Sequence, residues 1–294
     1  IYMKLISLIK ACRPKQWTKN LLCFSAIVIT PFSDDFIIKI SFATIAFILA
    51  SSSIYLINDI LDVEQDKLHP RKKFRPIASG EVKVWEAKIL FFICILFSLF
   101  LAINISYIFS GIILTYFFAQ LFYCFYGKNI ILFDIYLIAL GFVLRALGGV
   151  FSLEAAPSPW FLITSGCMAL FLAIQKRKSE LSRVSKNKII SRKVLKIYSL
   201  NYLDKIEMLA LNSGFISYML WASGPIFNGA QSSNMLITCP ILLIGINRYQ
   251  LISMRTKKDI LEGESPTQIL FSDLPIKFIV VSLLFSCWLI TNLS

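Results

Sequence analysis

The stretch NDILDVEQDKLHPRKKFRPIASG, residues 58–80, separates two apolar parts of the chain. It holds four acidic residues, five basic residues and the only histidine of the sequence, whereas the neighbouring runs 36–57 and 87–104 contain almost no charge. A helix needs about 20 mostly apolar residues to cross a bilayer, so each neighbouring run approaches or reaches that length. Residues 58–80 are therefore predicted to form a polar loop between two membrane helices.

The composition of the whole chain supports this prediction. Of 294 residues, 57% are hydrophobic and 25 are Phe, which is more than a soluble surface tolerates. We predict an all-α polytopic membrane protein that forms a single domain, residues 1–294, with cytoplasmic loops near 58–86 and 176–206. About nine transmembrane helices are expected, near residues 20–31, 36–57, 87–104, 106–126, 130–152, 159–175, 207–227, 235–254 and 275–293.

The placement of the basic residues orients the chain in the membrane. All but three of the 30 Lys and Arg residues lie in the N-terminal segment or in alternate loops, the exceptions being Lys39, Arg145 and Arg248. Cytoplasmic loops carry this excess, so we expect a multi-pass protein of the inner (cytoplasmic) membrane with a cytoplasmic N-terminus and active site. The net charge of +13 is assigned to contact with anionic membrane lipids, not nucleic acid. The sequence leaves open whether the protein forms a homo-oligomer.

Three polar residues, Asn58, Asp62 and Asp66, follow one another at intervals of four. If the second membrane helix continues past residue 57, their side chains share one helical face. Carboxylates one turn apart repel each other, and hard oxygen ligands without His or Cys favour Mg²⁺, which completes its shell with water and substrate phosphates. A basic cluster in the next turn would face a polyphosphate from the other side: Arg71, Lys72, Lys73 and Arg75. The alternative is a solvated loop whose acids balance its bases.

The same segment resembles a known family. NDILDVEQD matches the NDxxDxxxD signature of the UbiA superfamily of intramembrane prenyltransferases, and the resemblance implies a UbiA-like bundle in which Asn58, Asp62 and Asp66 hold Mg²⁺ against a diphosphate. Other pieces resemble one branch, the polyprenyl-phosphate phosphoribosyltransferases: RPKQWTKN (13–20), YLINDILDVEQDKLHPRKKFRPIASG (55–80), FVLRALGGV (142–150), KRKSEL (176–181), YSLNYL (198–203) and RY (248–249). This likeness implies transfer of phosphoribosyl from phosphoribosyl diphosphate (PRPP) to a polyprenyl phosphate, with release of diphosphate.

The loop after the sixth apolar segment favours this branch. Aromatic prenyltransferases of the superfamily usually carry a second Asp-rich motif there, whereas this chain has QKRKSEL at 175–181. Extra cations suit a site shared by a diphosphate, a ribose phosphate and a lipid phosphate, because like charges a few ångström apart repel unless countercharge intervenes. We therefore expect Lys176, Arg177 and Glu180 to bind substrate. The alternative is a basic surface that rests on lipid headgroups.

The segment RPKQWTKN supplies two further candidates. Lys19 and Asn20 follow Lys15 and Gln16 by one α-helical turn as the chain enters the first apolar segment. The match to the family motif favours Lys19 and Asn20 as residues of the substrate pocket. The alternative for the lysines is snorkelling to lipid headgroups.

Four polar residues further along the chain complete the candidate site. Tyr198 and Tyr202 are one helical turn apart and either present hydroxyls to a sugar or phosphate or anchor the membrane interface. Arg248 either reaches a phosphate or snorkels. Arg145 lies deep in its apolar segment, where a charge is costly, and is assigned to a cavity or to a structural role.

Two other functions compete with phosphoribosyl transfer. A prenyltransferase of the same superfamily would move a prenyl group from a prenyl diphosphate to an aromatic or other acceptor, and the basic second loop argues against it. A transporter or channel for anionic solutes also uses a cationic cavity, but transport gives no reason for a face of one Asn and two Asp. A lipid phosphate is largely deprotonated at neutral pH, so phosphoribosyl transfer needs no dedicated general base.

Overall fold

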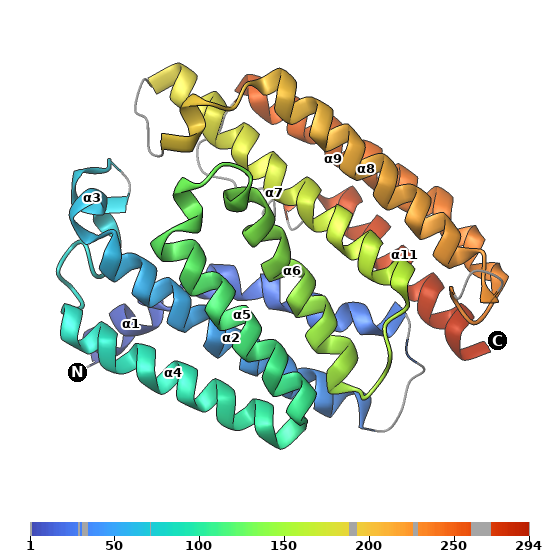
Figure 1. Ribbon diagram of the computed structural model, residues 1–294, viewed down its shortest axis with the longest axis horizontal. Helices are drawn as coiled ribbons and strands as arrows, with labels where there is room; N and C mark the ends of the chain where they lie inside the picture. The colour runs from blue at the N-terminus through green and yellow to red at the C-terminus, as the bar shows by residue number, and fades with distance from the viewer. Residues whose placement is uncertain are drawn as a thin grey trace.

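The computed structural model describes residues 2–28, 30, 35–70, 72–187, 193–225, 229–259 and 272–293, and these residues form helices without any strand (Figure 1). A long 3₁₀ helix, η1 (Pro14–Val28), follows the first α-helix. The α-helices of this part of the chain are α1 (Tyr2–Ala11), α2 (Phe36–Leu61), α3 (Val63–Leu68), α4 (Val84–Ile105), α5 (Tyr107–Phe125), α6 (Phe133–Ser152), α7 (Pro159–Asn187), α8 (Leu200–Ala222), α9 (Thr238–Asp259) and α11 (Leu274–Leu293). The predicted all-α fold is confirmed.

The helices form two adjoining groups. In Figure 1, α2, α4 and α5 lie together on one side, and α7, α8, α9 and α11 lie on the other. Helix α6 lies between the groups and packs against α5, α7 and η1. The short helix α3 continues from α2 at the edge of the bundle, so the polar segment 58–80 projects from the apolar core.

Seven helices are long and apolar enough to cross a membrane, within the ranges that the structure describes. They belong to α2, α4, α5, α6, α7, the segment Ser233–Ser253 and α11. The chain is therefore a multi-pass integral membrane protein, but the expected number of nine spans is not confirmed. The expected segment 207–227 is replaced by α8, which begins earlier and includes three charged residues in its first half: Asp204, Lys205 and Glu207. The expected segment 20–31 lies largely in η1.

The long 3₁₀ helix η1 changes which residues share a face. Its buried residues Asn20, Cys23 and Ala26 recur every third position, as three residues per turn require. The expected pairing of Lys15 with Lys19 at an α-helical interval of four is therefore wrong. With a rise of about 2.0 Å per residue, 15 residues in this conformation extend for roughly 30 Å, close to the thickness of the hydrocarbon core of a bilayer.

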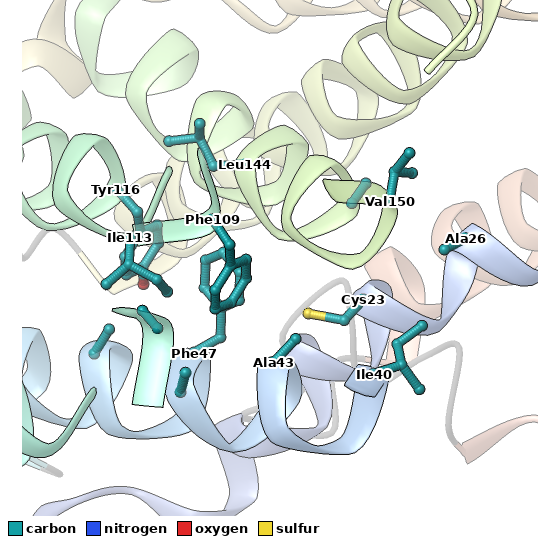
Figure 2. Close-up of a cluster of buried hydrophobic side chains, with 14 of the residues drawn as sticks. Cys23, Ala26, Ile40, Ala43, Phe47, Phe109, Ile113, Tyr116, Leu144 and Val150 are labelled. Carbon is teal, nitrogen blue, oxygen red and sulfur yellow. The ribbon is translucent and has the colours of Figure 1, made fainter. Parts of the chain in front are cut away.

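A glycine permits η1 to pack closely on α6. A Cβ atom built at Gly149 would lie 1.9 Å from the carbonyl oxygen of Cys23, so no other residue fits without moving one of the two backbones. Small residues at helix contacts allow this close approach in membrane proteins. Cys23 and Ala26 accordingly lie beside Val150 in the largest buried cluster (Figure 2).

Aromatic side chains fill the centre of the same cluster. The Phe47 ring of α2 meets the rings of Phe109 and Tyr116 of α5 edge to face, with centroids 5.8 and 5.5 Å apart (Figure 2). Such edge-to-face pairs contribute about 0.5–1.5 kcal/mol each beyond their buried area. This packing fixes α5 and α6 against α2 and so sets the position of the polar residues at the end of α2.

Candidate active site

The acidic segment forms a continuous helical turn at the end of α2. The Asp62 amide donates to the Asn58 carbonyl at 3.0 Å, and the Asp66 amide donates to the Asp62 carbonyl at 2.8 Å. Two successive hydrogen bonds of this i to i−4 type carry the helical path from α2 through Asp62 into α3. The backbone therefore has the continuity on which the predicted face of Asn58, Asp62 and Asp66 depends.

Basic side chains contact both carboxylates of this face. Asp66 is 1% exposed, and its Oδ2 accepts a hydrogen bond of 2.5 Å from Arg75 Nη1. Its Oδ1 has no hydrogen-bond partner, although Lys72 Nζ lies 3.5 Å away. Asp62 accepts a hydrogen bond of 2.6 Å from Lys128 Nζ. The chain thus supplies countercharge for carboxylates that would otherwise repel one another.

Asp59 forms a second ion-pair centre beside this face. Its carboxylate is 3% exposed and accepts hydrogen bonds from Arg13 and, at 3.0 Å, from Arg75 Nη1. Arg13 has a left-handed backbone with φ of 54° and lies over the Tyr55 ring, 5.0 Å from the ring centroid. No local pattern predicts this role, because Arg13 lies 46 positions before Asp59. Arg75 links the two centres by contacting both Asp59 and Asp66.

The oxygen donors of the predicted metal site fit Mg²⁺ in their chemistry. The described residues contain no group of three or more His, Cys, Asp or Glu side chains that could hold a metal. The predicted site would instead combine the carboxylates of Asp62 and Asp66 with the amide of Asn58. Mg²⁺ commonly binds one or two carboxylates and takes its remaining ligands from water and substrate phosphates. The buried Oδ1 of Asp66, which lacks a hydrogen bond, is available to such an ion. The ligand assignment stays a prediction.

Arg71 lies outside the described residues, and the other basic side chains of the turn after α3 are of two kinds. Lys72 and Arg75 face the carboxylates, as described above, whereas Lys73 is exposed and lies over the Phe74 ring at 5.1 Å. His69 accepts a hydrogen bond of 3.3 Å from the Lys72 amide through Nδ1, which shapes the turn. Lys73 is therefore free to meet an incoming anion, while Lys72 and Arg75 would meet one from beside the carboxylates.

Arg177, which was predicted to lie in the second cytoplasmic loop, is inside the protein. It pairs with Asp134 of α6 and with Glu180 of its own helix α7. It is fully buried, its Nε lies 2.6 Å from Asp134 Oδ2, and its Nη1 donates to Glu180. Nη2 donates to the Tyr123 hydroxyl at 3.2 Å. In this structure Arg177 and Glu180 neutralise each other, so the argument that Arg177 supplies spare charge for substrate phosphates is not supported.

Lys178 is buried in the same helix and also has acidic partners. Its Nζ contacts Glu207 and Asp204 of α8. Glu207 in turn accepts a hydrogen bond of 2.7 Å from Gln175, whose Oε1 accepts one of 2.8 Å from Ser253. These contacts join α7, α8 and α9 within the bundle. Lys176, between Gln175 and Arg177, is half-buried and stays a candidate for substrate binding.

Tyr198 positions the turn that precedes α6. Its hydroxyl donates to Asp134 Oδ1 at 2.7 Å and accepts from the Leu132 amide at 2.8 Å, so protein groups occupy it. Leu132 has a left-handed φ of 68°, which costs a non-glycine residue about 1 kcal/mol or more. Tyr202 stacks on the Tyr198 ring at 6.3 Å and remains 42% exposed. Tyr202 is therefore more accessible to a substrate than Tyr198.

Lys128 is a site residue that the sequence analysis missed. It lies in the short 3₁₀ helix η3 (Gly127–Asn129), between α5 and the turn that Tyr198 holds, and reaches Asp62 at 2.6 Å. A lone lysine between two apolar segments gives no local signal. Its contact with Asp62, 66 positions earlier, arises only from the packing of α5 and α6 against α2.

Arg248 lies at the contact between α9 and α11. Its guanidinium pairs with Asp273, with an Nη2 to Oδ2 distance of 3.1 Å. Asp273 Oδ1 also accepts a hydrogen bond of 2.9 Å from the Ile276 amide in the first turn of α11. The pair thus fixes the start of α11, and its Arg248 side chain is 36% exposed. A substrate role for Arg248 stays a prediction.

The two candidates of η1 differ in their surroundings. Asn20 is fully buried. Its Oδ1 accepts a hydrogen bond of 2.7 Å from Arg145 Nε, and its Nδ2 donates one of 3.3 Å to Ser51 Oγ. Both ends of its side chain are thus occupied by protein groups. Lys19 is half-buried and has no hydrogen bond or ion pair with any described residue. Lys19 therefore offers a cation to a ligand, whereas Asn20 orients Arg145.

Known proteins are similar to this chain in sequence and in fold. The sequence profile of the UbiA prenyltransferase family matches residues 21–261. Two relatives named decaprenyl-phosphate phosphoribosyltransferase align over 221 residues, 73% of this chain: that of Mycolicibacterium smegmatis is 38% identical over 70% of its length, and that of Corynebacterium glutamicum is 37% identical over 66% of its length. The structure of a UbiA homolog from Archaeoglobus fulgidus bound to GPP and Mg²⁺ superposes with a TM-score of 0.69 at 20% identity, covering 97% of this chain and 99% of that one, which is a likeness of fold.

Proposed function

The chain belongs to the UbiA prenyltransferase family, and on this premise we propose that it transfers a phosphoribosyl group from PRPP to a polyprenyl phosphate and releases diphosphate. The observation that carries the proposal is its identity of 37–38% to two relatives named for this activity, over 73% of the chain. The surroundings of Asp62 and Asp66 add support, because cations already lie in contact with these two carboxylates.

Mg²⁺ is the metal that we propose for the site, held by Asn58, Asp62 and Asp66. When bound, such an ion neutralises charge on a departing diphosphate. Charged side chains of the protein add to this effect. Lys128 and Lys72 lie beside the carboxylates and would face the diphosphate across them, and fixed cations next to developing negative charge stabilise a transition state.

The reaction is a displacement at the anomeric carbon of the ribose. An oxygen of the lipid phosphate forms a bond to this carbon, and the bond from the carbon to the diphosphate oxygen breaks, so that the diphosphate leaves with the bonding electrons. The attacking oxygen carries no proton at neutral pH, which removes the need for a general base. Positive charge that develops on the ribose is stabilised by nearby carboxylate and phosphate oxygens, as in other glycosyl transfers.

The membrane fold provides access for both substrates. The outer faces of α4 expose large apolar side chains such as Phe92, Phe97 and Phe100, as expected for helices in lipid. We propose that residues 1–294 act as one catalytic domain with α3 on the cytoplasmic side, because the loops that hold most of the basic residues are predicted to be cytoplasmic. PRPP would then arrive from the aqueous side and the polyprenyl tail from the bilayer.

An in vitro transfer assay tests the proposed function. Purified protein is incubated with labelled PRPP, a polyprenyl phosphate and Mg²⁺, and the lipid extract is examined for lipid-linked phosphoribose. A parallel reaction replaces PRPP with a prenyl diphosphate and an aromatic acceptor. We expect product only in the first reaction. Prenylated acceptor in the second reaction, without lipid-linked phosphoribose in the first, would instead establish the prenyltransferase alternative.

A further inference from the structure

Arg145 is a buried cation without an acidic partner. It is 5% exposed in the middle of α6, and its three hydrogen bonds go to Asn20 Oδ1 at 2.7 Å, the Gly141 carbonyl at 2.6 Å and the Tyr116 hydroxyl at 2.7 Å. The guanidinium also lies over the rings of Tyr116 and Phe142, 4.7 and 5.9 Å from their centroids, so aromatic faces and neutral acceptors surround it in place of a carboxylate. An arginine inside a membrane protein usually pairs with an acid or marks the path of an ion.

Lys19 is a second cation close to Arg145 that lacks a counterion. It follows Thr18 in η1 and directly precedes Asn20, the residue that holds Arg145 Nε. Lys19 lies near enough to Arg145 and Arg13 for their positive charges to act on its ammonium group. No carboxylate of a described residue forms an ion pair with either Lys19 or Arg145.

Several other buried or half-buried cations of the described chain are neutralised. Arg13 has Asp59, Arg177 has Asp134 and Glu180, and Lys178 has Asp204 and Glu207. Burying an unpaired charge costs several kcal/mol, so the fold pairs buried cations wherever it has no other use for them. The exception at Lys19 and Arg145 therefore indicates a missing anion.

The two cations lie deeper in the bundle than the acidic face. Asn20 contacts Ser51 of α2, and Ser51 precedes Asn58 by seven residues on the same helix. At 1.5 Å per residue, this separation is about 10 Å along α2. An anion at Lys19 and Arg145 would therefore be distinct from a diphosphate at Asp62 and Asp66, and would lie toward the membrane interior.

We infer that Lys19 and Arg145 form a second anion site, which takes a phosphate monoester. The inference rests on the proposed function, in which the substrates carry one such group each besides the diphosphate: the 5-phosphate of the ribose and the phosphate of the lipid acceptor. Both sources have the chemistry that the site requires. The depth of the site favours the lipid phosphate, because its polyprenyl tail occupies the hydrocarbon core.

Direct binding without Mg²⁺ and without turnover tests the inference. The variants are Lys19→Met and Arg145→Gln, and the matched control is Lys15→Met, which removes an exposed lysine from the same 3₁₀ helix. Thermal stabilisation of the purified protein is titrated with a short-chain polyprenyl phosphate, with the corresponding polyprenol and with ribose 5-phosphate. We expect wild type and Lys15→Met to bind a phosphate probe and not the polyprenol, and Lys19→Met and Arg145→Gln to bind it at least tenfold more weakly.

The probe that the variants bind more weakly shows whether the site takes the lipid phosphate or the ribose phosphate. Either result supports a phosphate monoester site. Wild-type affinity of Lys19→Met for both phosphate probes would overturn the inference, and this variant decides the matter if Arg145→Gln does not fold. The titration needs no catalysis. A wild-type protein that binds polyprenyl phosphate through Lys19 but forms no lipid-linked phosphoribose would contradict the proposed function alone.

Discussion

Asparagine substitutions at Asp59 and Asp66 should separate structural from functional charge at the end of α2. Asp59 is the only acid among the described residues that pairs with Arg13, and it also pairs with Arg75. Removing one partner of a buried ion pair costs about 3–5 kcal/mol. Because Arg13 and Arg75 are each 25% exposed and gain some hydration, we expect the lower end of that range, about 3 kcal/mol, for Asp59→Asn.

Asp66→Asn should destabilise the protein less, although Asp66 is at least as buried. Arg75 keeps its contact with Asp59 at 3.0 Å, and Lys72, which is 36% exposed, turns to water. The expected cost is about 1.5 kcal/mol, the lower end of the range for a hydrogen bond to a charged group. Phosphoribosyl transfer should nevertheless fall at least a hundredfold at saturating Mg²⁺, because the substitution removes a proposed metal ligand.

Thermal unfolding in detergent and the transfer assay, measured on the same preparations, check this pair. The expected order is a clearly lower melting temperature for Asp59→Asn than for Asp66→Asn, with activity lost in Asp66→Asn at temperatures where it remains folded. The reasoning is refuted if Asp66→Asn is the less stable of the two. Wild-type turnover of Asp66→Asn would remove the metal assignment.

Three other predictions follow from the contacts of the bundle. Gly149→Ala should destabilise the protein by several kcal/mol through its clash with the Cys23 carbonyl, whereas Gly166→Ala, where a Cβ meets nothing within 4 Å, should be neutral in the same melting assay. Tyr198→Phe should lower turnover through Lys128 more than it lowers the melting temperature, and unchanged turnover would separate that turn from the site. Arg248 lowers the pKa of Asp273, so this carboxylate stabilises the fold above its ordinary pKa near 3.8 and loses the effect as the pH falls through its lower folded value. Asp273→Asn should therefore cost under about 1 kcal/mol at pH 7 and flatten the acid limb of a profile of melting temperature against pH.

The local features of the chain could be predicted from the sequence. Apolar length identifies a membrane helix by itself, because the bilayer imposes a fixed thickness on any span. The four-residue spacing of Asn58, Asp62 and Asp66 predicts a shared face, and the helical hydrogen bonds that the prediction needs are present. The same residues identified the family, which the comparison confirmed. Spacing along one helix depends only on neighbouring residues.

The conformation of the first apolar segment could not be predicted in this way. A 3₁₀ helix of 15 residues is unusual on its own, because its hydrogen bonds are poorer than those of an α-helix. Here it is stabilised by packing on α6, where Gly149 allows two backbones to approach. The sequence shows the glycine and the apolar residues, but the contact that selects the conformation joins segments about 125 residues apart.

The sequence alone determined that the chain is a helical membrane protein, that its acidic face lies at the end of the second long helix, and which family it belongs to. Only the tertiary structure decided which charges are available to a substrate. Arg177, Lys178 and Arg248 each find an acid on another element, whereas Lys19 and Arg145 find none. A charge is neutralised by whatever lies within a few ångström of it, and those neighbours come from helices that are distant in sequence.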